Sequence, residues 1–340
     1  MIKIILDCFG GDKGPSATVG GAATALSLFG DLHLVLTGDE ETLKSEAAKA
    51  KLPEGRYSIL HASDVVGCDE KPTDVVRHRA DTSLMKGIEM LRAGDADGMV
   101  SVGSTGALIA AATMRVGRLK GVIRPAFCPL LPTMTGGIVG VCDSGANVDC
   151  TPERLRQFAI MGSLYLESVF DISNPRVALL NVGTEAEKGD LLRKNTYPLM
   201  ENTPSINFVG NMESRDLISG KYDLVVCDGF SGNVLVKSTE GAGIQLLKKL
   251  KTDISASLRN KIGALFLKKM FMQEKEFMNY QNYGGSVLLG TKKTVVKGHG
   301  SSNSVAVAKC IEQAYRMEAS KMNLRIEQEL AAVGSKEKDE

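Results

Sequence analysis

The stretch DLVVCDGFSGNVLVKSTEG, residues 223–241, contains the unit that decides the fold. It begins as an apolar run of the kind that forms a buried strand and continues as a pattern of helical period. Between the two, five of the six residues at 228–233 are Asp, Gly, Ser or Asn. A turn and a helix cap need only one glycine and one polar residue. We therefore expect a strand, a turn arranged around a ligand, and a helix.

Short apolar runs alternate with segments of helical period along the rest of the chain. The expected strands are IKIILD, HLVLTG, YSILHA, GMVSVG, GGIVGVCD, RVALLNVG, INFVG and DLVVCDG. The expected helices span roughly 15–29, 39–51, 82–93, 105–116, 152–170, 188–201 and 233–252. This alternation predicts βαβ units and an α/β fold with a largely parallel sheet. Because the strands are almost continuously apolar, we expect helices on both faces.

The length of 340 residues is more than one compact domain usually has, so it favours two lobes. No long linker separates them, and we expect interleaved lobes in one catalytic unit over residues 1–330. Residues 331–340 are polar and are expected to form a disordered tail.

Six of the expected strands run into polar, glycine-rich turns. These are CFGGD (8–12), GSTGA (103–107), DSGAN (143–147), GTEAEKG (183–189), GNMESRD (210–216) and DGFSGN (228–233). In open α/β sheets ligands bind beyond the carboxyl ends of the strands, where helix N-termini attract anions. The six turns together predict one shared anion-binding cleft. Each turn taken singly is also compatible with an ordinary βα connection.

The composition limits the class of partner and the compartment. The net charge is +1, so no overall field favours nucleic acid, and an anion site must be local. The seven cysteines include no C-x-x-C pair and are odd in number, which fits a reducing cytoplasm better than a disulfide framework. No signal peptide or run of about 18 apolar residues is evident. We expect a cytoplasmic protein that is soluble or attached at the membrane surface.

The common fingerprints of other enzyme classes are missing. The chain contains no G-x-G-x-x-G after the first strand, no Walker pattern, no G-x-S-x-G and no H-E-x-x-H. No cofactor and no metal site is therefore expected. His299 stands apart, between two glycines in VVKGHGSSN (295–303). It is either a solvated loop residue or a group for proton transfer or anion binding.

At these motifs the sequence resembles a known family, the phosphate acyltransferases (PlsX). The resemblance rests on DCFGGDKGP, SVGSTGALIAA, IRPAFCPLLPT, DSGAN, NVGTEAEKG, GNMESRDL, VVCDGFSGNVLVKSTEG, YGGSVLLG and VVKGHGSSN, in this order over roughly residues 2–320. Four positions depart from the family pattern, namely Phe9, Ser104, Ser214 and Gly298. The departure at Ser104, where Asn is usual, places any carboxamide role there in doubt.

The resemblance implies transfer of a fatty acyl group from acyl-acyl carrier protein to inorganic phosphate, giving acyl phosphate for phospholipid synthesis. It also implies two lobes around a cleft, like those of phosphotransacetylases and of isocitrate and isopropylmalate dehydrogenases, in a homodimer. The implied partners are acyl carrier protein, phosphate and a second copy of the chain, without nucleic acid. The residues implied to bind phosphate or substrate are Gly10, Gly11, Asp12, Ser104, Thr105, Asn147, Glu185, Asn211, Ser231, Gly232, Asn233 and Ser301.

Three side chains are candidates for the catalytic steps. Phosphate is charged enough to attack a thioester directly, so positioning and electrostatics should supply most of the acceleration. Lys188 is a candidate cation for phosphate or the oxyanion, although it also fits a solvated helix start. Asp228 is a candidate to orient phosphate or hold Lys188, although it also fits a helix cap. His299 is a candidate to anchor phosphate or protonate the leaving thiolate.

A basic amphipathic segment at 246–272 suggests a second activity. Apolar residues recur every three or four positions, and seven lysines and arginines accompany one acid, Asp253, in 246–271. The segment fits an anionic membrane surface, an acidic carrier protein or a core-packing hairpin at a dimer interface.

Other functions remain as alternatives to the acyl transfer from carrier protein. One is phosphotransacetylase-like transfer between acyl-coenzyme A and phosphate. A decarboxylating dehydrogenase of the same fold would need a nicotinamide site and clustered aspartates that the sequence does not display. A non-catalytic protein that binds membrane or carrier protein is the third alternative.

Overall fold

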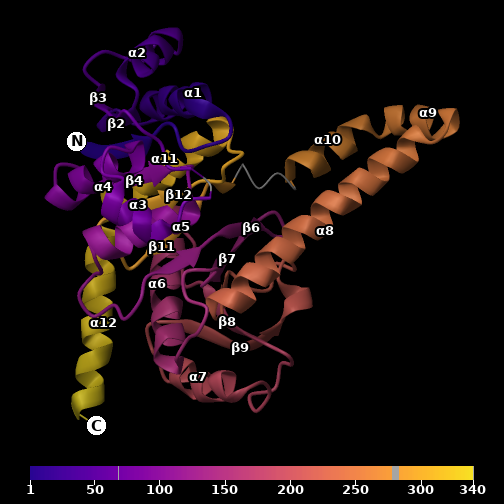
Figure 1. The fold of residues 1–340 in the computed structure, drawn as a ribbon. Helices are drawn as coiled ribbons and strands as arrows, with labels where there is room; N and C mark the ends of the chain where they lie inside the picture. Colours follow the sequence, from indigo (N-terminus) through magenta and orange to yellow (C-terminus); the bar gives the residue numbers. More distant parts are fainter. Residues whose placement is uncertain (68, 278–282, 340) are drawn as a thin grey trace.

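The computed structural model describes residues 1–67, 69–277 and 283–339 as two α/β lobes, each built on its own sheet (Figure 1). The first sheet has the order β3-β2-β1-β4-β12-β11-β5. Its strands are β1 (Ile2–Asp7), β2 (Leu32–Gly38), β3 (Tyr57–His61), β4 (Gly98–Ser101), β5 (Ala126–Cys128), β11 (Ser286–Leu289) and β12 (Thr294–Lys297). All neighbours in it are parallel except β11, which is antiparallel to both β12 and β5.

The second sheet has the order β6-β7-β10-β8-β9. Its strands are β6 (Leu130–Pro132), β7 (Ile138–Cys142), β8 (Arg176–Asn181), β9 (Asn207–Glu213) and β10 (Leu224–Val226). Only the β6–β7 pair is antiparallel. The α/β class with two lobes is confirmed, and each lobe has its own mixed, mostly parallel sheet. The strand pattern did not reveal the short strands β5, β11 and β12 of the first sheet or β6 of the second.

Helices cover these sheets and join the lobes. Those of the first lobe are α1 (Gly14–Leu28), α2 (Glu40–Lys49), α3 (Pro72–His78), α4 (Ser83–Ala93), α5 (Thr105–Ala111), the π-helical turn η1 (Ala112–Val116) and α11 (Ser304–Ala319). Those of the second lobe are α6 (Pro152–Phe170), α7 (Leu191–Glu201) and the 3-10 turn η2 (Ser214–Asp216). Helix α6 packs against α11 and α12 (Met322–Asp339), which ties the two lobes together.

The chain enters the second lobe after β5 and returns to the first lobe at β11. The lobes are therefore interleaved, as expected from the lack of a linker. Strand β1 illustrates how each sheet is buried on both faces. Ile4 and Leu6 belong to the cluster that includes residues of α1 and α11, whereas Ile5 belongs to the cluster that includes residues of α4. Successive strand side chains point to opposite faces, so an unbroken apolar strand needs helices on both.

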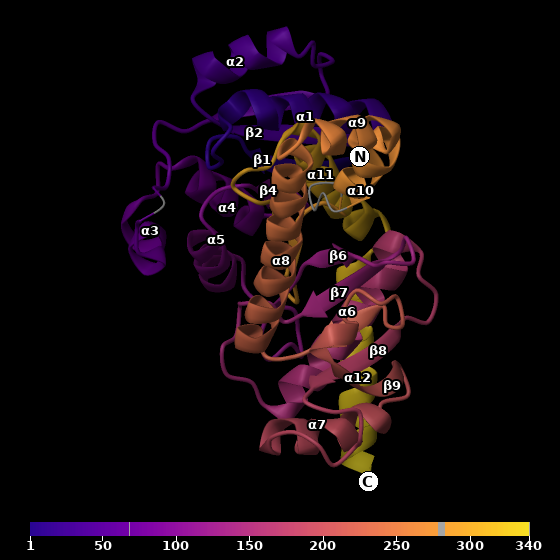
Figure 2. The same ribbon diagram turned by 90° about the vertical axis from the view of Figure 1, so that its right-hand side faces the viewer.

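One long helix leaves the body of the protein. Helix α8 (Gly229–Ser255) begins in the DGFSGN turn and leads away from the lobes, with α9 (Leu258–Phe266) at its far end and α10 (Lys268–Phe277) returning (Figure 1). Seen from the side, α8 rises from the level of the second sheet to that of the first lobe (Figure 2). No residue of α9 is buried.

The C-terminal segment differs from its expectation. Residues 331–340 were expected to be disordered, but α12 continues as a helix to Asp339. The segment is rich in Ala, Lys and Glu, which are good helix formers, so a helix started by the packed turns of α12 can extend through it.

Candidate functional site

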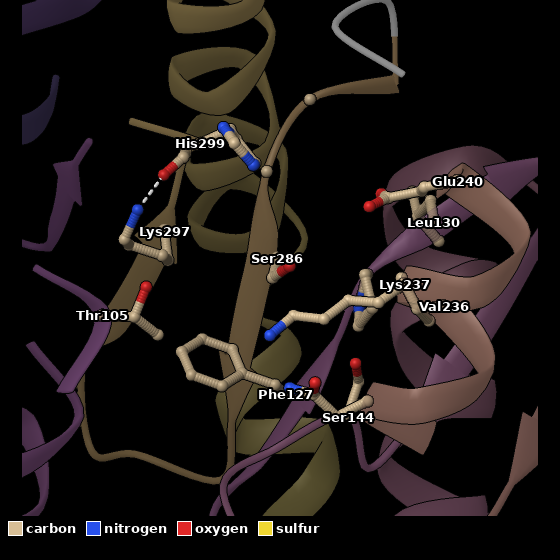
Figure 3. Close-up of a pocket in the computed structure, with 15 residues that line it drawn as sticks. Thr105, Phe127, Leu130, Ser144, Val236, Lys237, Glu240, Ser286, Lys297 and His299 are labelled. Carbon is tan, nitrogen blue, oxygen red and sulfur yellow. Dashed lines mark hydrogen bonds between the residues drawn. The ribbon is translucent and has the colours of Figure 1, made fainter. Parts of the chain in front are cut away.

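A cavity of about 420 Å³ lies between the two lobes (Figure 3). Its lining residues are Thr105, Phe127, Pro129, Leu130, Ser144, Asn233, Val236, Lys237, Glu240, Gly284, Gly285, Ser286, Lys297, Gly298 and His299. They come from the GSTGA, DSGAN and DGFSGN turns, from the first turns of α8, from the β5–β6 segment, and from the residues at the start of β11 and the end of β12. Three of the six turns expected to share a cleft, namely GSTGA, DSGAN and DGFSGN, contribute to this lining, whereas CFGGD, GTEAEKG and GNMESRD do not. Thr105, Asn233 and His299 are the expected site residues that line the cavity.

The cavity is lined by more positive than negative side chains. Lys237 projects from α8 toward Ser144 and Phe127, and Lys297 and His299 lie on the opposite wall (Figure 3). The one carboxylate of the lining, Glu240, has its pKa raised by burial, against the opposing effect of Lys237. Two lysines against one carboxylate, together with a histidine that can donate a hydrogen bond, favour an anionic ligand. Neither lysine was predicted as a site residue, although both lie inside the quoted motifs.

His299 is oriented by its own loop. Its Nδ1 lies 2.9 Å from Ser301 Oγ and 3.3 Å from the Ser301 backbone nitrogen, which donates to it. Burial lowers the pKa of the imidazole, and nearby Lys297 lowers it further. The neutral ring is therefore the prevailing form at neutral pH, with its proton on Nε2 because Nδ1 accepts a hydrogen bond. Ser301 serves to orient His299 and does not itself line the cavity.

The glycines of the first turn are explained by backbone packing. A Cβ on Gly10 would lie 2.5 Å from Gly103 Cα, and one on Gly11 would lie 3.2 Å from Gly300 O. The Asp12 backbone N–H donates to Gly300 O over 2.9 Å. CFGGD, GSTGA and GHGSS are therefore packed together behind the cavity wall, and Gly10, Gly11 and Asp12 shape that wall without lining it.

Ser104 has a local role in the same wall. Its hydroxyl accepts a hydrogen bond from the Ala107 backbone N–H at 3.4 Å and caps α5. Capping satisfies a helix N-terminal donor and holds Thr105 at the start of the helix.

Asp228 and its neighbours form the start of α8. The Asp228 carboxylate accepts from the Ser231 N–H and hydroxyl at 2.8 Å each, and from the Arg193 guanidinium. Arg193 also lies 3.2 Å from Ser231 Oγ. Burial raises the pKa of Asp228, but Ser231 and Arg193 outweigh it and leave the pKa below its usual value. The suggestion that Asp228 holds Lys188 is wrong, because Arg193 on α7 occupies that position.

The excess of glycine in DGFSGN has a packing cause. The Gly229 N–H donates to Asn147 O at 2.7 Å, and a Cβ on Gly232 would overlap the carbonyl oxygen of Asp143. The first turn of α8 thus lies directly on the DSGAN loop. Asn233 is the residue of this turn that lines the cavity.

Asp143 organises the DSGAN loop and was not predicted. Its buried carboxylate accepts from the backbone N–H groups of Phe127, Ser144 and Ala146 at 2.7 to 3.2 Å. It also accepts from the Asn147 N–H at 2.6 Å and from the Asn147 amide at 2.9 Å. The Asn147 amide donates to Pro125 O as well, so Asn147 is a structural residue in this loop. The sequence did contain a signal for this role, because an Asp at the first position of a turn of small residues commonly accepts hydrogen bonds from the backbone of that turn.

Lys188 lies outside the cavity lining. The GTEAEKG loop that carries it is exposed, and it is held by Asn181, whose amide donates to Lys188 O at 3.0 Å, and by Asn211, whose amide donates to Glu185 O at 2.7 Å. Asn211 and Asn181 therefore shape the loop. Lys188 and Glu185 are exposed at the carboxyl end of β8, on the same edge of the second sheet as Asp228.

Comparison with known proteins places this geometry in a family. A family model described as "Fatty acid synthesis protein" matches residues 2–325. The phosphate acyltransferase of Bacillus cereus is 44% identical over 318 residues, which cover 94% of this chain and 95% of that protein. The phosphate acyltransferase of Clostridium acetobutylicum is 42% identical over 327 residues, covering 96% and 98% of the two chains.

A solved structure shares the fold at lower identity. A phosphotransacetylase from Streptococcus pyogenes superposes with a TM-score of 0.59 at 18% identity, covering 93% of this chain and 94% of that one. The phosphotransacetylase-like fold expected from the motifs is thereby confirmed. The family match over most of the sequence and the high coverage of the relatives lead to one conclusion: this chain is an enzyme of the phosphate acyltransferase family.

Proposed function

We propose that this enzyme transfers a fatty acyl group from acyl-acyl carrier protein to inorganic phosphate by direct attack of phosphate on the thioester. The observation that supports this most is the cavity between the lobes, whose lining carries Lys237, Lys297 and His299 and includes no cysteine. Such a lining suits an anionic nucleophile and needs no covalent enzyme intermediate.

The chemistry assigns distinct tasks to the two walls. A phosphate oxygen forms a bond to the thioester carbon, the carbonyl oxygen becomes negative, and the carbon–sulfur bond then breaks. We assign Asn233 and Lys237, which line the cavity from α8, to donate to that oxyanion, as fixed donors do in other acyl transfers. We assign the Nε2–H of His299, which lines the facing wall, to donate a hydrogen bond to phosphate or to the departing thiolate.

The test measures free carrier thiol and acyl phosphate, trapped as hydroxamate, with palmitoyl-acyl carrier protein as donor. We expect equal amounts of the two products, both dependent on inorganic phosphate. Palmitoyl-coenzyme A in place of the carrier protein tests the phosphotransacetylase-like alternative. Thiol release that is independent of phosphate would indicate a thioesterase and contradict the proposal.

The same assay tests Lys188, which we propose as an exposed cation that attracts substrate at the edge of the cleft. We expect Lys188→Ala to lower kcat/KM by about tenfold to a hundredfold, since one charge-assisted hydrogen bond contributes roughly 1.5 to 3 kcal/mol. Lys194→Ala, an exposed lysine on α7, is the matched control. Equal activity of the two variants would remove Lys188 from the mechanism.

We further propose that α8–α10 contacts an anionic bilayer. Leu258, Ile262, Leu265 and Phe266 are 75%, 51%, 70% and 86% exposed, with lysines and arginines interspersed. A basic helix with an uncovered apolar side binds at a membrane interface. No helix in the described parts of the chain is long and apolar enough to span a membrane.

Vesicle flotation tests the membrane contact. We expect the wild-type chain to float with vesicles containing phosphatidylglycerol, and the Leu258→Glu/Phe266→Glu variant to remain in the lower fraction, since each change adds an acid at the apolar surface. Leu324→Glu, a change at a half-exposed residue of α12, is the control. Equal flotation of all three chains, or none, would contradict the proposal.

A further inference from the structure

Lys297 is the least expected feature of the cavity wall. It is the last residue of β12, which pairs in parallel with β4 so that Lys297 lies beside Ser101, two residues before the GSTGA turn. The side chain is buried, with the residue 8% exposed, yet it lines the cavity. A lysine is almost never buried unless its charge is paired, so its surroundings need an explanation.

No carboxylate of the described residues forms an ion pair with this amine. Its hydrogen bond is to the Gly298 carbonyl oxygen, which leaves further donors of the ammonium group (Figure 3). Asp7, the last residue of β1, already accepts from the hydroxyls of Ser83 at 2.6 Å and Ser101 at 2.7 Å. The charge on Lys297 is therefore buried at the edge of a cavity with a backbone carbonyl as its hydrogen-bond partner and no carboxylate of the described residues at ion-pair distance.

We propose that Lys297, as an ammonium ion, binds the phosphate substrate. The bound phosphate would then supply the negatively charged partner that no carboxylate of the described residues provides. The inference rests on the proposed function for the identity of the anion. Phosphate would lie between Lys297 and the His299 loop on the first-lobe wall, with the α8 wall left for the thioester. Because Lys297 is 8% exposed, water solvates its ammonium group less well than that of an exposed lysine, and an anion bound there is stabilised more strongly.

Binding of an anion to Lys297 should be coupled to uptake of a proton by its amine. Burial lowers the pKa of Lys297 to about 8, although Cys310, Asp7 and Asp12 oppose the effect. At about pH 8 roughly half of the free enzyme then carries a neutral amine, and binding of an anion to the ammonium form draws in about half a proton per site. Below about pH 7 the amine is already charged, and the uptake should vanish.

Other titratable groups surround the same space. His299 has a lowered pKa and is neutral at about pH 8, and the pKa of the Cys310 thiol on α11 is raised to about 12. Asp7 and Asp12 approach from the first-lobe side, while Lys237 and Glu240 face Lys297 from α8. A variant of Lys297 is therefore needed to assign the proton.

The experiment measures anion binding by titration calorimetry in two buffers of different ionisation enthalpy, without any acyl donor. Sulfate is the probe, because it does not itself titrate near neutral pH, and inorganic phosphate is measured in parallel. We expect sulfate binding with proton uptake at about pH 8. Lys297→Met should weaken binding by about tenfold to a hundredfold and abolish the uptake. Lys297→Arg should retain binding without uptake, since a guanidinium is always charged.

Two outcomes would overturn the inference: no sulfate binding to the wild-type chain, or unchanged affinity and uptake in Lys297→Met. Lys292→Met, at an exposed lysine of the β11–β12 hairpin, is the matched control. If the bulkier Arg prevents folding, the affinity and proton uptake of Lys297→Met are sufficient to test the proposal, because Met is tolerated at a buried position. Failure of acyl transfer in the activity assay leaves this binding result interpretable, so the two proposals fail separately.

Discussion

Gly232→Ala is expected to destabilise the protein by about 3 kcal/mol and to abolish acyl transfer. A methyl group at this position would overlap the carbonyl oxygen of Asp143, which belongs to the backbone of the facing loop. Backbone atoms cannot rotate away as the end of a flexible side chain can. The first turn of α8 would have to move off the DSGAN loop, and Asn233 and Lys237 would move with it.

Urea unfolding and the phosphate-dependent assay measure the two effects. Gly241→Ala provides the control in the same helix, because a Cβ there meets no atom within 4 Å. That change should stabilise the helix by roughly 0.5 to 1 kcal/mol through backbone entropy alone. If Gly232→Ala were as stable and active as the control, the close contact between α8 and the DSGAN loop would be disproved.

Arg193→Met is expected to cost about 3 kcal/mol of folding stability at neutral pH, because it leaves the carboxylate of Asp228 without a cation. The side chains of Arg193 and Asp228 are only 12% and 9% exposed, so water replaces the lost partner poorly. The same change loosens the start of α8 and should lower kcat/KM together with stability. Unfolding curves of the wild-type and variant chains at several pH values measure the effect.

The stability lost in Arg193→Met should depend on pH, because it depends on the charge of Asp228. The pKa of Asp228 is below the ordinary value of 3.8 in the folded protein, so its contribution is complete above that value and is lost as pH falls through the folded pKa. The difference between the two chains should therefore be largest near about pH 7 and shrink below about pH 4.

A second substitution separates the ion pair from other losses. Adding Asp228→Asn to Arg193→Met removes the unpaired charge and keeps a good capping residue, so it should restore part of the stability. A penalty for Arg193→Met that is independent of pH, with no recovery in the double variant, would attribute the loss to packing alone.

The regular elements were largely predictable because they follow from local periodicity. The helix expected at 152–170 is α6 with the same bounds, and the helix expected at 105–116 corresponds to α5 followed by η1. The strands β5 and β6 were missed, because each has three residues and only Pro129 separates them. Strands this short carry no measurable alternation and exist through their pairing with β11 and β7.

The candidate site was predictable in its outline and not in its contacts. Thr105 and Asn233 were identified because their turns follow expected strands, and parallel strands bring such turns to one edge. His299 was identified because it lies between two glycines in VVKGHGSSN. Lys237 and Lys297 were missed, since nothing local tells a lysine that faces a cavity from one that faces solvent. Glycines at 10, 11 and 232 were expected at the ligand, and the structure adds a packing reason for them, since they allow close backbone contact between turns distant in sequence.

The sequence by itself determined the α/β class, the order of most elements, the glycine-rich turns and, through its motifs, the family. Each of these depends on residue type and spacing along the chain. Only the tertiary structure decided that there are two sheets, that Asp228 pairs with Arg193 and that Lys297 is buried without a carboxylate partner. Those facts depend on which distant segments meet, because burial and charge pairing are set by neighbours in space.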